Sequence, residues 1–289
     1  MGKRRQSGWQ RLLKLVESND GLPTRESGSW AAEKLFAWNR YIEITTTAMV
    51  GNPKWPGGVN YVDLFCGPGV CSVRGSKERF PGSPLIAANA PKPFSKILLC
   101  ELDGASADAC CQRMDASPAA GCYRMFRGDC NQVVADIANE LPANGLTLAF
   151  LDPTGLHVHM ETVVALSGRG AVDLLILFPD SIDIIRNDRA YYFDNVESNL
   201  DKVLGKGLEW RTKKQAAEGM DASRLRKLYA TIYQEQLTRL AGYGFFDELV
   251  IKGPSGPLYR LVYASKNSMG VKFWRESVKR NLGGQRTLF

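Results

Sequence analysis

The pattern of hydrophobic and polar positions changes near residue 58. Before that point, apolar residues recur at three- and four-residue steps, which is typical of one face of an amphipathic helix. Ser29 has the chemistry of a helix N-cap, and the Gly- and Pro-rich stretch 51–58 would end the helix. The apolar face of this predicted helix consists of Ala31, Leu35, Trp38, Ile42, Thr45 and Met49.

From residue 59 onward, short apolar runs alternate with helical patterns. This alternation predicts a parallel sheet with helices on both faces, and such strands are apolar without alternation because both faces are covered. The predicted strands are Val59–Phe65, Ile97–Leu102, Tyr123–Phe126, Leu146–Leu151 and Leu174–Phe178. The predicted helices between them lie near Ser83–Ala90, Ala105–Asp115, Asn131–Leu141 and Met160–Leu166.

The last third of the chain has a different pattern. Residues 181–241 are predicted to form a mostly helical insertion, with Asp221 capping a helix. Two strand-like runs, Phe246–Ile251 and Leu258–Ala264, flank a Gly/Pro loop and predict a hairpin at the sheet edge, followed by a helix from Met269 to Gly283-Gly284. We therefore divide the chain into a helical extension (1–58), an α/β core (59–180), the insertion (181–241), and a hairpin with a C-terminal helix that completes the core (242–289).

The composition limits the partners and the cellular location that we expect for the protein. The chain carries 37 Lys+Arg against 30 Asp+Glu, a formal net charge of +7 that permits a nucleic-acid partner without requiring one. No apolar run approaches the roughly 20 residues of a membrane span, and the N-terminus lacks a signal-peptide core, so we expect a cytoplasmic protein with no membrane partner. The seven Cys contain no C-x-x-C pair, and neither a metal site nor a disulfide framework is expected.

The strongest local signal is the glycine loop that follows the first core strand. Ligands in open parallel sheets bind beyond the carboxyl ends of the strands, and here Asp63, Phe65, Gly67, Pro68 and Gly69 stand at such an end. A dinucleotide loop requires a third Gly and an immediately following helix. The third position is Ser72, and the next helix start is Ser83. A phosphate-free cofactor fits better, and the acidic residue four before the first Gly suits the positively charged methionine moiety of S-adenosylmethionine. A tight turn without a ligand is the alternative.

Acidic residues follow the next two strands. Glu101 could accept both ribose hydroxyls, with Asp103 as the alternative acceptor, or either could be a solvated carboxylate. Asp129 could accept a hydrogen bond from an adenine amino group, cap the following helix, or do both. The long connection Val70–Gly82 could form a lid over the cofactor.

The fourth strand ends in Asp152-Pro153-Thr154-Gly155, which places candidate catalytic groups beside the glycine loop. Asp152 is a candidate both for contact with the cofactor and for catalysis: it could hold an amine donor or take its proton after transfer, although Asp-Pro is also a common turn starter. Pro153 and His157 complete the catalytic candidates. His157 and His159 are the chain's two histidines, too few for a zinc site, and surface positions are the alternative.

These residues resemble the class I S-adenosylmethionine-dependent methyltransferases over roughly residues 59–180. The chain resembles the three-Cys-motif partner family more closely. The motifs that carry this resemblance are Trp30, Lys34 and Tyr41 in the first helix, the Asp63–Gly69 loop, Gly82–Pro84, Gly128–Asp129, the Asp152–Gly155 turn, and the tail Gln285–Phe289.

The resemblance implies an α/β fold: a doubly wound, mostly parallel, seven-stranded methyltransferase-like sheet with an antiparallel edge hairpin and a helical insertion. It implies a partnership with a radical S-adenosylmethionine iron–sulfur protein that carries the three Cys. It also places Asp63, Gly67 and Gly69 at the methionine end of the cofactor, Glu101 at the ribose and Asp129 at the adenine.

One departure affects the expected substrate. Methyltransferases that act on the exocyclic amine of adenine stack the flipped base on an aromatic residue of an Asp/Asn-Pro-Pro-aromatic turn, and Thr154 and Gly155 replace the second Pro and the aromatic here. We expect a methyltransferase acting on nitrogen of a nucleobase or small amine. The alternative is an accessory subunit without independent catalysis, and a nicotinamide-dependent oxidoreductase is disfavoured by the glycine loop. A basic patch could contact phosphates, or could be a solvated helix face; it consists of Arg211, Lys213, Lys214, Arg224, Arg226 and Lys227.

Overall fold

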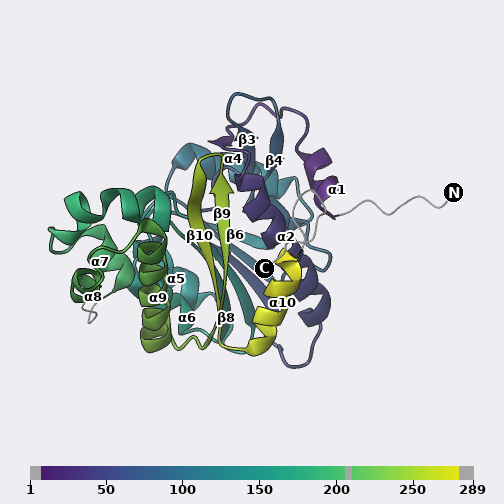
Figure 1. Cartoon of the computed structure of the whole chain (residues 1–289). Coiled ribbons are helices and arrows are strands. Elements are labelled where there is room, and N and C mark those ends of the chain that lie inside the picture. The colour runs from purple at the N-terminus through teal and green to yellow at the C-terminus, as the bar shows by residue number, and fades with distance from the viewer. Residues whose placement is uncertain (1–7, 206–209, 280–289) are drawn as a thin grey trace.

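The computed structural model describes residues 8–205 and 210–279, and its centre is a seven-stranded sheet (Figure 1). The strand order is β6-β5-β2-β7-β8-β10-β9, and β10 runs antiparallel to both of its neighbours. The strands are β2 (Val59–Asp63), β5 (Lys96–Glu101), β6 (Tyr123–Arg127), β7 (Leu146–Leu151), β8 (Ala171–Phe178), β9 (Phe245–Gly253) and β10 (Gly256–Ser265). The predicted doubly wound, mostly parallel, seven-stranded α/β sheet with an antiparallel edge hairpin is confirmed.

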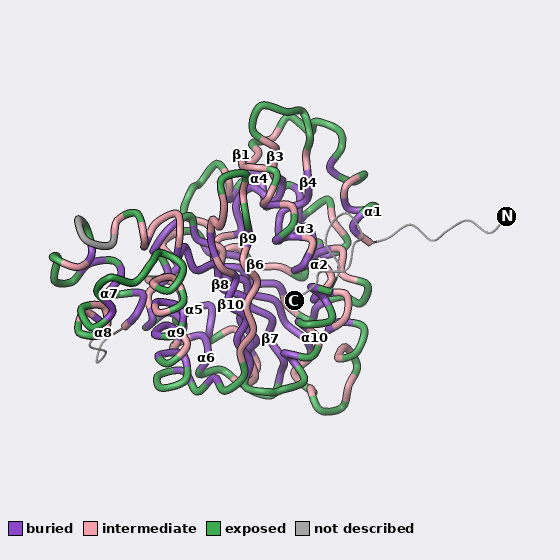
Figure 2. The backbone as a smooth tube through the Cα atoms, viewed as in Figure 1, coloured by how far each residue is buried: buried purple, intermediate pink, exposed green. Residues whose placement is uncertain are grey.

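Each central strand sends alternate side chains into two separate cores. In β7, Leu148 and Phe150 join the core on one face, whereas Ala149 and Leu151 join the core on the other. Figure 2 shows these central strands buried along most of their length. Burial on both faces explains why the sequence runs of these strands are apolar throughout.

Helices cover both faces of the sheet. One face carries α1 (Gly8–Leu15), α2 (Ala31–Met49), α3 (Ser83–Ala88), α4 (Gly104–Asp115) and α10 (Ser268–Val278). The other carries α5 (Cys130–Asn139), α6 (Met160–Ser167), α7 (Asn199–Leu204), α8 (Trp210–Ala216) and α9 (Ala222–Ala241). In the part of the chain that the structure describes, no helix is long and apolar enough to cross a membrane.

The first long helix, α2, packs deep against the sheet. Trp38 stacks on Phe150 with 5.1 Å between ring centroids, and its Nε1 donates to the hydroxyl of Tyr61. The prediction that Ser29 caps this helix is wrong. Helix α2 begins at Ala31 after Trp30, without a side-chain cap, because a tight turn of backbone bonds over residues 28–33 already satisfies its first N–H groups.

The segment after the fifth parallel strand is helical, as predicted. It contains two π-helical stretches, η1 (Asp180–Ile185) and η2 (Asp188–Phe193), followed by α7, α8 and α9. Asp221 caps α9 by accepting a hydrogen bond from Arg224 N, as predicted. The predicted end of the last helix at residues 283–284 and the tail Gln285–Phe289 lie outside the described residues.

A second, three-stranded sheet lies beside the glycine loop. Strand β1 (Arg25–Ser27) pairs in parallel with β3 (Val70–Val73), which pairs with β4 (Arg79–Pro81). The connection considered as a lid is therefore a hairpin tied to the N-terminal segment. The sequence did not predict β1, because three residues carry too little periodicity to reveal a strand.

Candidate functional site

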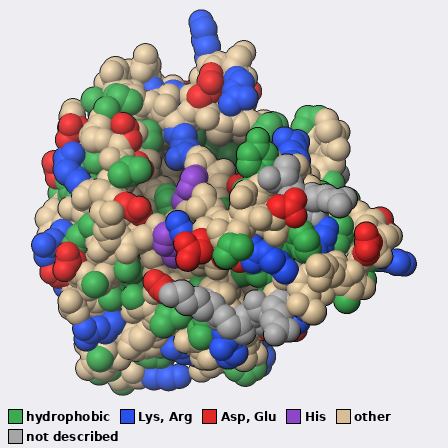
Figure 3. Space-filling model, turned by 90° about the vertical axis from the view of Figure 1, so that its left-hand side faces the viewer, with side chains coloured by type: hydrophobic (Ala, Val, Ile, Leu, Met, Phe, Trp, Pro, Cys, Tyr) green, Lys and Arg blue, Asp and Glu red, His purple; other side chains and the backbone are tan. Residues whose placement is uncertain are grey.

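A cavity of about 310 Å³ lies at the carboxyl ends of β2, β5, β6 and β7. Figure 3 looks onto a hollowed face on which the two His side chains of the chain lie. Apolar side chains of the lining include Leu64, Phe65, Leu102 and Leu156. Its polar lining includes Arg25, Glu101, Asp129, Asn131, His157 and His159.

Glu101 joins two strand ends at this cavity. Its Oε2 accepts a hydrogen bond of 2.8 Å from Gly67 N, and its Oε1 accepts one of 2.9 Å from Asp103 N. Gly67 and Gly69 have φ of +60° and +87°, a region that favours glycine. The loop then continues directly into β3 rather than into a helix, as the sequence predicted. Glu101 is thereby held at the mouth of the glycine loop, with lone pairs left for a ligand.

Asp63 lies beneath the loop rather than in the lining of the cavity. It is fully buried, and it accepts hydrogen bonds from Phe65 N and the Tyr61 hydroxyl. Burial raises the pKa of Asp63 from 3.8 to about 7. Of the five predicted loop contacts, Phe65 lines this cavity, whereas Asp63, Gly67, Pro68 and Gly69 are outside its lining.

Arg113 of α4 fixes the loop from the other side. Its guanidinium donates to Pro68 O at 2.5 Å and to Pro23 O at 2.8 Å, and it forms an ion pair with Asp20. The hydrogen bonds from Arg113 hold the pKa of Asp20 well below its usual range. One buried arginine therefore ties the glycine loop to the N-terminal segment that delivers Arg25 to the cavity.

The two remaining predicted carboxylates both cap helices. Asp103 is exposed and accepts from Ser106 N at the start of α4; it lies outside the cavity lining. Asp129 accepts from Asn131 N at the start of α5 and lines the cavity. Both helix N-termini at these strand ends thus already carry a carboxylate, which opposes a phosphate there.

Asp152 follows β7 and pairs with Lys34 of α2, a residue that we had not predicted as part of the site. The Lys34 Nζ to Asp152 Oδ2 distance is 2.5 Å, and the Lys34 side chain is 9% exposed. Burial opposes the charge of Lys34, but the Asp152 carboxylate and Tyr259 outweigh it and raise the lysine pKa. The pair lies 118 residues apart in sequence, so no local pattern could reveal it, although Lys34 is one of the residues of the family resemblance.

Two buried oxygen atoms beside this ion pair are unpartnered. Neither Asp152 Oδ1 nor the Tyr259 hydroxyl has a hydrogen-bond partner within residues 8–205 and 210–279. Lys34 Nζ lies 5.5 Å from the centroid of the Tyr259 ring. Buried polar atoms without partners cost free energy, which makes this cluster a candidate partner for a polar group of a substrate. Neither Asp152 nor Tyr259 belongs to the lining of the 310 Å³ cavity.

The other two predicted catalytic residues, Pro153 and His157, lie in different parts of the structure. Pro153 is buried in a small void beside Tyr233, outside the main cavity. His157 is exposed and lines the cavity. Asn131 holds this turn because its Nδ2 donates to His157 O and its Oδ1 accepts from His159 N. The sequence did not single out Asn131 or Arg25 as lining residues, because neither belongs to a recognisable motif.

The basic groups of the insertion are largely engaged in contacts within the protein. Arg211 forms an ion pair with Asp201 and donates to three backbone carbonyls. Lys213 pairs with Glu235, and Arg226 donates to Ser181. These contacts favour a structural role over contacts with phosphates.

No family model matches the sequence, and no curated protein matches it. Among solved structures, a Legionella pneumophila protein of family model DUF519 has a TM-score of 0.49 at 10% identity, over 87% of this chain and 92% of that one. An O-methyltransferase from Bacillus cereus in complex with SAH has a TM-score of 0.47 at 9% identity, over 91% and 92%. The O-methyltransferase TomG from Streptomyces achromogenes, in complex with SAM, has a TM-score of 0.43 at 7% identity, over 91% and 100%. At such identities the likeness concerns the fold, and no residue correspondence follows from it.

Proposed function

We propose that the chain is an S-adenosylmethionine-dependent methyltransferase that acts on nitrogen of a nucleobase or a small amine. The observation that carries this proposal is the position of Glu101, whose carboxylate is hydrogen-bonded to the glycine loop at a cavity beyond the strand ends. The cofactor, when bound, supplies an electrophilic methyl group. The chain's own residues would bind it, exclude water and orient the acceptor.

The chemistry of the cavity fits this cofactor. Glu101 would accept the ribose hydroxyls, and Asp129 would accept the adenine amino group. Phe65 and Leu102 provide apolar contact for the adenine ring. The capped helix N-termini offer no site for a pyrophosphate, which argues against a nicotinamide dinucleotide. Asp63 and the glycines would fix the conformation of the loop that contacts the methionine end of the cofactor.

The acceptor would lie at Asp152. Lys34 occupies Oδ2 of this carboxylate, so Oδ1 remains to accept a hydrogen bond from an amine N–H. That bond would aim the nitrogen lone pair at the methyl group. Asp152 or solvent would take the additional proton that the nitrogen carries after methylation.

A second candidate function rests on the same ion pair. The Asp152 carboxylate is already engaged by a buried lysine, and Thr154 and Gly155 supply no aromatic platform for a flipped base. Both features favour an accessory subunit that holds the cofactor while a partner performs the chemistry. In this second proposal the chain is a member of the three-Cys-motif partner family. Its partner is then a radical S-adenosylmethionine iron–sulfur protein.

A transfer assay separates the two functions. The purified chain is incubated with methyl-labelled S-adenosylmethionine and three acceptor pools: nucleosides, nucleic acid and small amines. The enzyme proposal predicts labelled product, reduced about 10²–10⁴-fold in Asp152→Asn and unchanged in Asp136→Asn, an exposed carboxylate on α5. Cofactor binding without transfer to any pool, followed by transfer only when an iron–sulfur partner is added, would establish the accessory role instead.

A further inference from the structure

A second cavity, of about 220 Å³, lies at the amino ends of the parallel strands, opposite the candidate site at their carboxyl ends. It is lined by the first residues of β7 and β8, Leu146 and Ala171, and by the last residue of the antiparallel strand β10, Ser265. The end of α2, the loop that follows it and the start of α10 complete its walls. No residue is shared with the 310 Å³ cavity, so the two sites can be tested separately.

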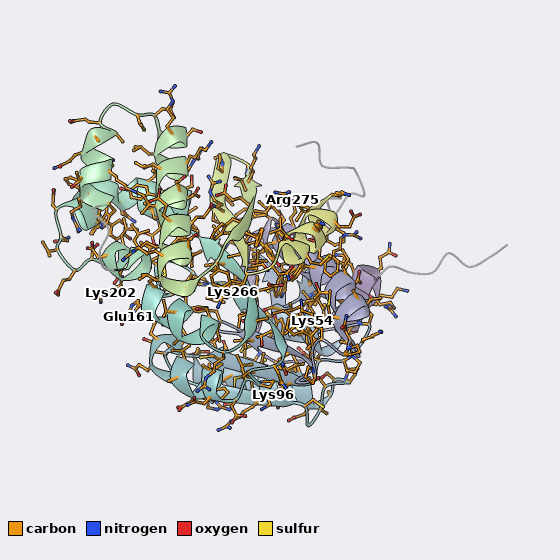
Figure 4. All side chains as sticks on the ribbon, turned by 90° about the horizontal axis from the view of Figure 1, so that it is seen from below. Lys54, Lys96, Glu161, Lys202, Lys266 and Arg275 are labelled. Carbon is orange, nitrogen blue, oxygen red and sulfur yellow. The ribbon has the colours of Figure 1, made fainter. Side chains whose placement is uncertain are left out.

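The charged groups of this cavity are mainly positive. Lys54 and Lys266 belong to the lining (Figure 4). The first turn of α10, an 11-residue helix, also faces it through Met269 and Gly270, and Asn267 caps this turn by accepting a hydrogen bond from Met269 N. The one acid in the lining, Asp173, is already bonded to the Tyr41 hydroxyl at 2.7 Å. Burial raises the pKa of Asp173.

The remaining walls are apolar and contain a buried donor without a partner. Met49, Trp55, Met269 and Phe273 supply aromatic and thioether surface. The indole Nε1 of Trp55 is buried and has no hydrogen-bond partner in the described part of the chain. Lys54 Nζ lies 4.9 Å from the Trp55 ring centroid, so its ammonium packs over the indole ring. Indole is a donor only, so the missing group must be an acceptor.

We propose that this cavity is a second ligand site that binds a small aromatic carboxylate. The carboxylate accepts from Trp55 Nε1 and pairs with Lys54, while the ring lies among the apolar side chains at the start of α10. Aromatic carboxylates combine the acceptor, the negative charge and the flat apolar body that these walls require. The site is independent of methyl transfer, because it lies at the other edge of the sheet.

The test is saturation-transfer NMR titration of the full chain with phenylacetate and indole-3-acetate, with phenylacetamide as the uncharged control. We expect saturable binding of the carboxylates and binding of the amide weakened about tenfold or more, since the amide lacks the negative charge that pairs with Lys54. Lys54→Gln and Trp55→Phe should each weaken carboxylate binding about tenfold. Lys96→Gln, which changes a charge on the same edge outside the cavity, should leave it unchanged.

Four results would overturn the proposal. The first is the absence of saturable binding by either carboxylate. The second is equal affinity for the amide, and the third is an equal loss in Lys96→Gln. The fourth is loss of binding in Glu101→Ala, which would place the probe in the 310 Å³ cavity. Binding at the second cavity by a protein that does not bind S-adenosylmethionine would support this site while the proposed function fails.

Discussion

At the scale of single residues, the glycine loop is supported by a carboxyl group that is costly to ionise. Asp63 is fully buried between the Tyr61 hydroxyl and Phe65 N, and its pKa lies at about 7. Between pH 4 and pH 7 the folded protein therefore keeps a proton that the unfolded chain has already released. The folded state binds more protons in this range, so this group makes stability fall as pH rises.

The variant Asp63→Asn should remove that dependence. Its amide oxygen can still accept from Phe65 N, and it does not ionise. Relative to the variant, the free energy of unfolding of the parent protein should fall by up to roughly 4 kcal/mol between pH 4 and pH 7, at 1.36 kcal/mol per pKa unit. Urea unfolding at several pH values measures this difference. Parallel curves for the two proteins would mean that Asp63 does not titrate in this range.

The Lys34–Asp152 pair is a second effect at residue scale. Lys34→Met leaves the Asp152 carboxylate without its partner and should cost about 3 kcal/mol of stability, because breaking a buried pair leaves an uncompensated charge. Asp152→Asn in the same protein should restore part of the loss. A double-mutant cycle by urea unfolding measures the coupling, and a coupling energy near zero would contradict the pairing.

At the scale of elements, one side chain of α4 connects the glycine loop to the N-terminal segment, which lies more than 40 residues away in sequence. Arg113 reaches Pro68 O in the glycine loop, Pro23 O before β1 and the carboxylate of Asp20. The loop conformation therefore depends on a helix face as well as on its glycines. Gly82 closes the same region, because a Cβ there would lie 2.8 Å from Gly69 O.

Arg113→Met should loosen the loop. We expect a loss of about 2–4 kcal/mol in unfolding free energy, since buried carbonyls and Asp20 lose their donor, and about tenfold weaker binding of S-adenosylmethionine. The control is Arg127→Met, an exposed ion pair with Asp108, which should change stability by less than about 1 kcal/mol. Equal effects of the two variants on cofactor binding would exclude a special role for Arg113.

The success of sequence-based prediction also differs by element. Strands of the central sheet could be predicted because burial on both faces leaves long apolar runs, and β7 was found over its full length, Leu146–Leu151. Strand β1 could not, since its pairing with β3 joins residues 46 positions apart. At the site, Glu101 and Asp129 followed from their places at strand ends, whereas Lys34 and Arg25 reach the region from the N-terminal extension.

At the scale of the whole molecule, the two ends of the parallel strands carry cavities of different chemistry. We call the carboxyl ends of the strands the carboxyl edge and their amino ends the amino edge. The carboxyl edge holds the 310 Å³ cavity with Glu101 and Asp129, and the Lys34–Asp152 pair follows β7 on the same side. The amino edge holds the 220 Å³ cavity with Lys54 and Lys266. The N-terminal extension contributes to both edges, because α2 begins near Lys34 and ends near Met49.

Calorimetric titration tests whether the 310 Å³ cavity binds S-adenosylmethionine. The chain and its Glu101→Ala variant are titrated with S-adenosylmethionine, its demethylated product S-adenosylhomocysteine, and NAD. We predict saturable binding of the first two to the parent protein, at least about tenfold weaker binding to Glu101→Ala, and no binding of NAD. Binding of NAD, or no binding of S-adenosylmethionine by a folded protein, would contradict the proposed cofactor site.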